Sequence, residues 1–239
     1  MIHYIFCFYR ESNLERNIEI EEAISTNLKS EYIETATIVL ENCDLPDFVE
    51  GYRQKLQIIR RSDRAKFSDL FKLFKEKHHN IIANNDIIFE FSMIARLNLN
   101  LIRNYCLCLT RWELDGSLFH ENIGDSQDTW IFGSNLNKKA IQGLGEYYLG
   151  VLGCDNRLLY ELYSINIPIM NIPYLYRTVH NHQSRVRNYN ESSRLSGWQF
   201  WLKPTSFLEA CLIAQFLMLK SHKITKWLKG NRYIYYFNR

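Results

Sequence analysis

An alternation of strand-like and helix-like segments runs from the start of the chain to about residue 163 and limits the folds open to it. Residues 2–9 form an apolar run rich in Ile, Phe and Tyr that ends at residues 10–13, as expected for a first strand. Residues 14–28 then carry apolar side chains at helical spacing, with glutamates at other positions. Residues 34–40 and 57–60 predict the next two strands. This order favours an α/β layered domain.

The alternation continues beyond residue 60. Phe67, Leu70, Phe71 and Phe74 recur at i, i+3, i+4 and i+7 and predict an amphipathic helix, with Ser62 as its N-cap, that ends near residues 78–80. The run IIANNDIIFE predicts an apolar strand interrupted by two amides and a carboxylate. Further elements are expected as strands at residues 105–110 and 129–132 and as a helix at residues 155–163.

Length and composition exclude several classes of protein. With 239 residues, 46% of them hydrophobic, and only 10 Gly and 4 Pro, the chain suits one large domain, alone or with a short appendage. The net charge of +3 is too small to indicate nucleic-acid binding. The 6 cysteines show no spacing typical of zinc sites or disulfide frameworks, which favours a reducing cytosol. No basic segment precedes the first apolar run, so it is interpreted as a strand and not as a signal peptide.

The last forty residues differ from the rest. Residues 204–222 predict a strongly apolar helix, and residues 223–239 interleave bases with aromatics. The apolar run at residues 207–219 contains Glu209 and Gln215 and is too short to span a membrane. Two interpretations stay open: a core helix, or an interfacial helix whose basic and aromatic neighbours contact an anionic inner leaflet.

The triplet Asn84-Asn85-Asp86 interrupts the apolar run of residues 81–90. A carboxylate at the carboxyl end of a buried parallel strand is too costly to leave unpaired, and α/β sheets bind ligands in the crevice at that edge. Asp86 is therefore a candidate ligand for a divalent cation that also contacts phosphate. The alternative is a polar turn whose side chains bond to local backbone.

A second polar cluster lies at residues 109–132. Arg111 and Trp112 follow one predicted strand, while Asp125 and Asp128 precede another, so the cluster predicts a polar pocket. Trp112 or Trp130 would stack there on a sugar face. A tryptophan packed in the core and aspartates in turns would give the same pattern.

A third cluster surrounds Gly153. Asp155 and Asn156 fall in the first turn of the helix predicted there. Asp155 is a candidate general base for an acceptor hydroxyl, and the alternative is a helix-capping role that interacts with the helix dipole.

A fourth cluster combines imidazoles with guanidinium groups. His180 and His182 are two residues apart, so on a strand both would point to one face, and Arg185 and Arg187 follow. No third ligand stands at a typical zinc spacing, and the mixture fits a diphosphate better.

The order of these pieces carries a resemblance. The strings ANNDIIF, LTRW, DSQDTWIF, GCDNRLLYEL and HNHQSRVRNY, in this order, resemble a bacterial and viral group of glycosyltransferase-like proteins with the nucleotide-diphospho-sugar transferase (GT-A) fold. The resemblance runs from about residue 2 to residue 189. It implies a mixed sheet flanked by helices, with residues 1–190 as a catalytic domain and residues 191–239 as a C-terminal helical, basic and aromatic appendage.

In such enzymes an Asp-x-Asp motif ends a central strand and holds a divalent metal on the donor diphosphate. The matching triplet begins with Asn84 in place of the first acid, which leaves Asp86 as the implied ligand of Mn²⁺ or Mg²⁺. The resemblance makes His182, with His180 as the second choice, the histidine that completes the metal shell. It implies donor contacts from a further set of residues: Asn84, Asn85, Arg10, Arg60, Arg64 and Arg185.

The implied reaction is a single displacement with inversion, in which Asp155 acts as the base, and retention stays open. Trp112, Asp125, Asp128 and Asn156 are expected around the acceptor. The implied partners are a nucleotide-sugar donor and a glycan or lipid-linked acceptor, without nucleic acid, at the cytoplasmic face of the membrane. Two alternatives remain: a sugar nucleotidyltransferase, which should carry a glycine-rich basic loop after its first strand, and a non-catalytic carbohydrate-binding protein.

Overall fold

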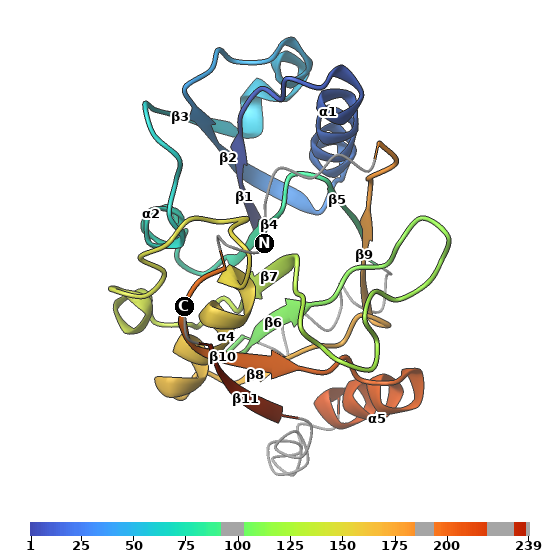
Figure 1. The fold of residues 1–239 in the computed structure, drawn as a ribbon. Coiled ribbons are helices and arrows are strands. Elements are labelled where there is room, and N and C mark those ends of the chain that lie inside the picture. Colours follow the sequence, from blue (N-terminus) through green and yellow to red (C-terminus); the bar gives the residue numbers. More distant parts are fainter. Residues whose placement is uncertain (92–102, 185–193, 219–231, 238–239) are drawn as a thin grey trace.

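The computed structural model describes residues 1–91, 103–184, 194–218 and 232–237, and its centre is a mixed seven-stranded sheet (Figure 1). The strand order is β3-β2-β1-β4-β7-β6-β8. The strands β3, β2, β1 and β4 are parallel, β7 is antiparallel to both of its neighbours, and β6 is parallel to β8. Their bounds are β1 Ile2–Phe8, β2 Ile33–Glu41, β3 Leu56–Arg61, β4 His79–Ala83, β6 Cys106–Leu109, β7 Thr129–Phe132 and β8 Ile169–Met170.

Helices cover both faces of this sheet. Figure 1 shows α1 on one side and α2 and α4 on the other. Two further pairs of strands form small antiparallel sheets, β5 with β9 and β10 with β11. The bounds of these elements are α1 Leu14–Lys29, η1 Asp47–Lys55, α2 Phe67–Lys72, η3 Lys138–Ile141, α4 Cys154–Ser164, α5 Phe207–Met218, β5 Ile87–Phe91, β9 Tyr176–His180, β10 Gly197–Leu202 and β11 Arg232–Phe237.

Strand β1 shows why the sheet has two cores. Tyr4, Phe6 and Phe8 pack with α1 on one face, while Ile5 and Cys7 join the core beneath α2 and α4 on the other. Successive side chains of a strand point to opposite faces, and a parallel strand with helices on both sides is apolar throughout. All seven residues of β1 are accordingly buried.

The structure confirms the predicted α/β class and the mixed sheet flanked by helices. Two local predictions are wrong. Helix α2 is shorter than expected, since it begins at Phe67 with Lys66 as N-cap and ends at Lys72. The run of residues 81–90 is two strands in different sheets, because residues 84–86 turn the chain between β4 and β5.

The C-terminal segment contains more than the predicted helix. Strand β10 precedes α5 in the sequence and β11 follows it, and the two strands pair with each other. Strand β10 also packs against α4. Phe200 and Leu202 of β10 belong to the core beneath α2 and α4. The division at residue 190 stays a prediction. Within the described residues, no helix combines the length and the apolar composition that crossing a bilayer would take.

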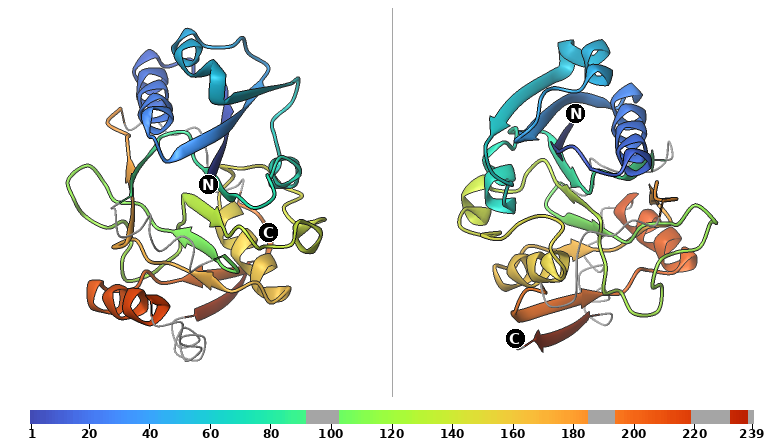
Figure 2. Two further views of the ribbon diagram at one scale, coloured as in Figure 1. Left: turned by 180° about the vertical axis from the view of Figure 1, so that it is seen from behind. Right: turned by 45° about the horizontal axis from the view of Figure 1, so that its top comes forward.

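One edge of the sheet gathers polar residues from four strands. The carboxyl ends of β1, β4 and β6 lie there beside the start of the antiparallel strand β7, because Ala83 and Leu109 both pair with Thr129. The β5–β9 sheet begins at the same place, where Ile87 pairs with His180. In the left view of Figure 2, α1 (blue) lies toward the top of the molecule and α5 (red-orange) toward the bottom. The topology thus brings residues far apart in sequence to the crevice where α/β sheets bind ligands.

Candidate functional site

A pocket of about 610 Å³ opens at this edge of the sheet. Its walls come from the ends of β1, β4 and β6, from the start of α1, from the segment before β7 and from the loop before α4. The charged and histidine side chains that line it are Glu11, Arg16, Glu41, Arg64, Asp86, Arg111, Asp128, Asp155, His180 and His182. A polar pocket of this size, with carboxylates and cations in its lining, suits a charged small molecule.

Asp86 is buried, with 6% of its surface exposed. Its Oδ2 accepts hydrogen bonds from His180 Nε2 at 3.0 Å and from the Arg16 guanidinium. Burial alone would raise the pKa of this carboxyl, but the bond from His180 and the charge of Arg16 outweigh burial and hold the pKa well below its usual range. Asp86 is therefore a fixed negative charge.

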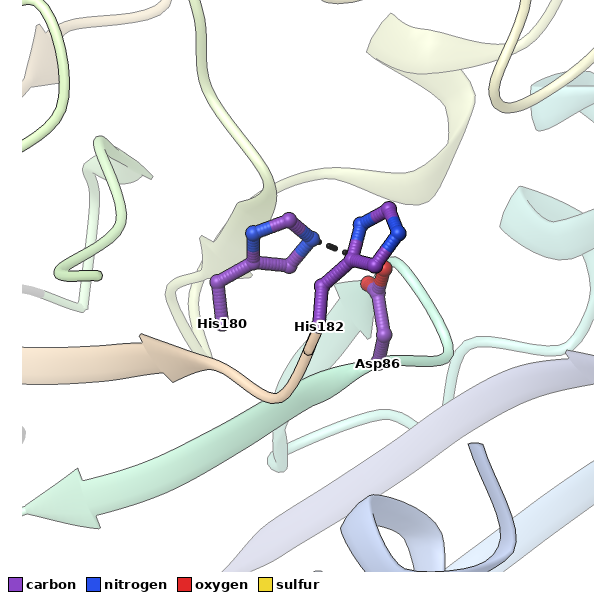
Figure 3. Close-up of side chains that lie close together, drawn as sticks. All are labelled: Asp86, His180 and His182. Atoms are coloured by element: carbon purple, nitrogen blue, oxygen red, sulfur yellow. Dashed lines mark hydrogen bonds and ion pairs between the residues drawn. The ribbon is translucent and has the colours of Figure 1, made fainter. Parts of the chain in front are cut away.

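His182 lies next to this carboxylate, and Figure 3 shows Asp86, His180 and His182 converging from two chain segments. One ligand atom from each lies within 4.8 Å of the others. Asp86 Oδ1 and His182 Nε2 are buried and lack a hydrogen-bond partner among the described residues. Carboxylate oxygen and imidazole nitrogen are suitable ligands for Mn²⁺, so the donor set fits a divalent cation.

Burial and the nearby Arg16 charge also lower the pKa of His182, which keeps its ring neutral and able to bind a cation. His180 differs. Burial lowers its pKa, but the hydrogen bond and the charge of Asp86 outweigh burial, so its pKa is raised overall. His180 Nδ1 also lies 3.2 Å from Glu113 Oε2, which fixes the orientation of the ring as second-layer carboxylates do in metal sites.

A chain of charges continues from Glu113 across the pocket. Arg111 donates from Nε to Glu113 at 2.8 Å and from Nη1 to Asp128 Oδ2 at 2.9 Å. Asp128 Oδ1 accepts from the Asn84 amide at 2.7 Å. A carboxylate at position 84 would face that of Asp128 across the same distance, which is unfavourable. The amide at Asn84 is thus matched to Asp128, the acid that directly precedes the neighbouring strand β7.

Asp155 also lines the pocket and stands in the first turn of α4. Gly153 precedes the helix with φ +81°, a left-handed conformation that glycine adopts without strain. Asp155 Oδ2 accepts from the backbone N–H of Gln127 at 3.0 Å. Desolvation by the surrounding protein raises the pKa of Asp155 to about 7, backbone N–H groups oppose this rise, and the charge of Asp128 adds to it. Its side chain keeps part of its surface open to the pocket.

The structure brings together most of the residues singled out from the sequence. Those that line the pocket are Arg64, Asn84, Asn85, Asp86, Asp128, Asp155, His180 and His182. Arg64 donates a hydrogen bond to the backbone carbonyl of Leu149, in the loop before α4. Arg185 lies outside the described residues.

Five other predicted residues do not line this pocket. Arg10 and Arg60 are exposed. The Trp112 indole donates to the Pro173 carbonyl and packs against the Arg177 guanidinium, and its contact with a sugar stays a prediction. Asp125 accepts from His120, and Asn156 donates to the Asp125 carbonyl, so both hold the loop before β7 in place.

Arg16 and Glu19 were not predicted from the sequence as residues of the site. They stand three residues apart near the start of α1, a pattern that usually marks an exposed ion pair. A topological signal was nevertheless present, because α1 follows β1 directly and its first turn must lie at the carboxyl edge of the sheet.

No family model matches the sequence, and no curated protein sequence matches it. Solved structures do match the fold. The crystal structure of S. aureus TarS aligns with a TM-score of 0.52 at 12% identity, over 75% of this chain and 36% of that one. The crystal structure of GalNAc-T7 with UDP, GalNAc and Mn²⁺ aligns with a TM-score of 0.50 at 7% identity, over 75% of this chain and 43% of that one.

These alignments show the nucleotide-diphospho-sugar transferase, or GT-A-like, fold that the sequence motifs predict. At such low identity they show the fold alone. The chain spans about a third of the TarS chain and less than half of the GalNAc-T7 chain.

Proposed function

We propose that this chain is a glycosyltransferase that moves a sugar from a nucleotide-diphosphate donor to a hydroxyl acceptor. The observation that carries the proposal is a pair of carboxylates in one pocket whose environments shift their pKa values in opposite directions. Asp86 is held ionised beside two histidines, while the pKa of Asp155 is raised to about 7. Two acids whose environments push their pKa values apart are suited to different roles in one reaction.

In this proposal the donor diphosphate lies near Asp86. Asp86 and His182 would hold a divalent cation, and His180 would become a further ligand only by exchanging its Nε2 hydrogen bond to Asp86 for the cation. A bound cation would neutralise charge on the diphosphate oxygens. Arg64 faces the same pocket and adds a positive charge for the phosphates. Arg10 and Arg60 do not line the pocket, and Arg185 lies outside the described residues, so the proposal assigns the donor contacts to Arg64 and to residues 84–86.

Asp155 is the proposed base. Its carboxylate accepts the proton of the acceptor hydroxyl while that oxygen attacks the anomeric carbon, and the bond from this carbon to the diphosphate oxygen breaks. The attack comes from the side opposite the leaving group, so the configuration inverts. A base with a pKa near 7 is ionised in about half of the molecules at neutral pH, which suits it to this task.

The proposed acceptor is a glycan or a lipid-linked saccharide, used in surface polysaccharide synthesis at the cytoplasmic membrane face. The support for peripheral membrane contact is local. Phe207, Leu208 and Leu212 of α5 are 63%, 69% and 42% exposed, and the residues that follow α5 in the sequence are rich in lysine.

Vesicle sedimentation tests the membrane contact. Phe207→Ser with Leu208→Ser should reduce binding to phosphatidylglycerol vesicles, whereas Leu14→Ser, which alters an equally exposed apolar residue at the far end of the molecule, should not. Equal binding by both variants would remove the membrane contact and leave the transferase proposal intact.

A screen of nucleotide sugars tests the main proposal. UDP-, GDP- and CDP-linked sugars, each with and without Mn²⁺, are assayed for a rise in the melting temperature and for hydrolysis or transfer. One donor should both stabilise the protein and turn over. Stabilisation by nucleoside triphosphates with release of pyrophosphate would instead indicate a sugar nucleotidyltransferase. Stabilisation by saccharides alone would indicate the non-catalytic alternative, which the amide at Asn84 favours.

A further inference from the structure

Asp86, the carboxylate best placed to hold a metal cation, already has a positively charged guanidinium beside it. Arg16 reaches from the first turns of α1 to Asp86 Oδ2, and the side chains of Arg16 and Asp86 are 12% and 8% exposed. A divalent cation at Asp86 would meet this guanidinium at close range. Two positive charges on one buried carboxylate repel strongly, because the protein interior screens charge poorly.

Arg16 has a second partner that does not depend on Asp86. Its Nη1 donates to Glu19 Oε2 at 3.0 Å. Glu19 is itself fixed from the other side, since its Oε1 accepts from the backbone N–H groups of Gln183 and Ser184, each at 2.6 Å. Glu19 is thus a rigid carboxylate that can keep Arg16 within the pocket when Asp86 is taken.

The atoms around Asp86 divide in a way that fits two occupants. Arg16 and His180 use Oδ2, while Oδ1 and His182 Nε2 have no partner among the described residues. A buried unpaired carboxylate oxygen and a buried unpaired imidazole nitrogen are costly to maintain. They become ligands once a cation enters, and Arg16 is then the group that must move.

We propose that Arg16 is a resident counter-ion of Asp86 that competes with the divalent cation, and that it releases Asp86 but keeps its bond to Glu19 when the cation binds. This inference rests on the cation site of the proposed function. Displacing Arg16 from Asp86 adds a free-energy cost to cation binding. When no cation is bound, the guanidinium charge of Arg16 balances the carboxylate charge of Asp86. In the position that it takes on Glu19, Arg16 also places its guanidinium beside the donor phosphates.

A purely structural ion pair would behave differently. If Arg16 only ties α1 to the edge of the sheet, its loss lowers stability and leaves cation affinity unchanged or weaker. Under competition, the loss of Arg16 tightens cation binding. The sign of the change in cation affinity therefore separates the two readings, whatever happens to stability.

Calorimetric titration with Mn²⁺ alone, without donor, measures that sign. Arg16→Gln should bind Mn²⁺ roughly tenfold or more tightly than the wild type, which corresponds to about 1.4 kcal/mol. Arg53→Gln is the matched control, because Arg53 also pairs with a glutamate three residues away but lies exposed in η1. It should bind as the wild type does. If Arg16→Gln does not fold, Arg16→Ala, checked by circular dichroism, gives the same test.

Three outcomes are informative. Equal or weaker Mn²⁺ binding by a folded Arg16 variant overturns the competition but leaves the cation site standing. No Mn²⁺ binding by any variant overturns both the competition and the cation site, and the donor screen without metal then decides the transferase proposal separately. Tighter binding that disappears again in Arg16→Gln with Asp86→Asn supports the competition at this carboxylate.

Discussion

Asp86 and Asp155 line the same pocket, yet their surroundings are opposite in kind. Asp86 is bound by a guanidinium and an imidazole, and its pKa is lowered despite burial. Asp155 is bound by the backbone N–H of Gln127, and burial raises its pKa to about 7. Burial acts on both in the same direction, so the difference comes from the charged partners. The hydrogen-bond and charge partners, more than the depth of burial, thus set the pKa of each acid.

The partners differ because the chain supplies them differently. Asp86 follows a central strand and meets side chains from α1 and β9, which the topology brings to the same edge. Asp155 stands in the first turn of a helix and faces the segment before β7, which offers a backbone donor and the negative charge of Asp128. The surroundings of Asp86 therefore keep that carboxylate ionised, whereas those of Asp155 favour its protonated form.

The largest expected effect comes from removing the proton acceptor. Asp155→Asn keeps the shape of the side chain but cannot accept the proton of the acceptor hydroxyl, so transfer should fall by about 10²–10⁴-fold. Donor binding, measured by the shift in melting temperature, should remain. The wild-type rate should also rise with pH through an apparent pKa near 7.

Asp125→Asn serves as the control for this variant, since it makes the same change in the neighbouring loop outside the pocket lining. A transfer rate in Asp155→Asn within a few-fold of that in Asp125→Asn would reject Asp155 as the base. A loss of donor binding in Asp155→Asn would instead place that carboxylate among the donor contacts.

The second prediction concerns stability at the other acid. Asp86→Ala removes the carboxylate that Arg16 and His180 share, and leaves each of them with one other carboxylate. It should lower the free energy of unfolding by about 3 kcal/mol in metal-free buffer, the low end for breaking a buried charge pair. Denaturant unfolding measures this change, and Asp155→Ala, which breaks no charge pair, should lose less. Similar losses in the two variants would erase the contrast between the two acids.

Much of the fold was accessible from the sequence because it depends on local patterns. The alternation of Tyr4, Phe6 and Phe8 with Ile5 and Cys7 is the apolar pattern of a central strand, and the structure confirms that strand. Strand β8 has only two residues, and β10 and β11 depend on pairing with each other across α5, so no local pattern indicates them.

The residues of the site also differ in whether a local sequence pattern indicates them. Asp86 and Asp155 follow strand and helix boundaries that the sequence marks, so both were found. Arg16 was not, because its role depends on a partner 70 positions away along the chain. The amide at Asn84 is explained only by Asp128 across the β4–β7 pair, which no spacing in the sequence reveals.

The third prediction uses pH to compare the acids in the folded state. The pKa of Asp155 is near 7 in the fold and about 4 when unfolded, so the folded state holds the extra proton between these values. Its stabilising contribution is complete below about pH 4 and is lost as the pH rises toward 7. The wild type should thus lose about 2 kcal/mol relative to Asp155→Asn over this range, a value reduced because the carboxyl is partly open to water. Urea unfolding of both proteins at intervals of pH measures it, and parallel curves would contradict the raised pKa.

The smallest expected effect tests whether the charged surroundings of Asp86 extend beyond the groups that touch it. Glu113 contacts His180 Nδ1 at 3.2 Å and is held by Arg111, so Glu113→Gln keeps the shape and removes the charge that orients the imidazole. Mn²⁺ affinity should fall by about tenfold, at the low end for second-layer carboxylates. Glu121→Gln removes a charge from the same loop, at a residue that binds Tyr174 instead, and should leave Mn²⁺ affinity unchanged. If Glu113→Gln loses no more Mn²⁺ affinity than Glu121→Gln, the groups that affect the cation would be limited to Asp86, His180 and Arg16. The contrast with Asp155 would then rest on these three residues and not on a longer chain of charges.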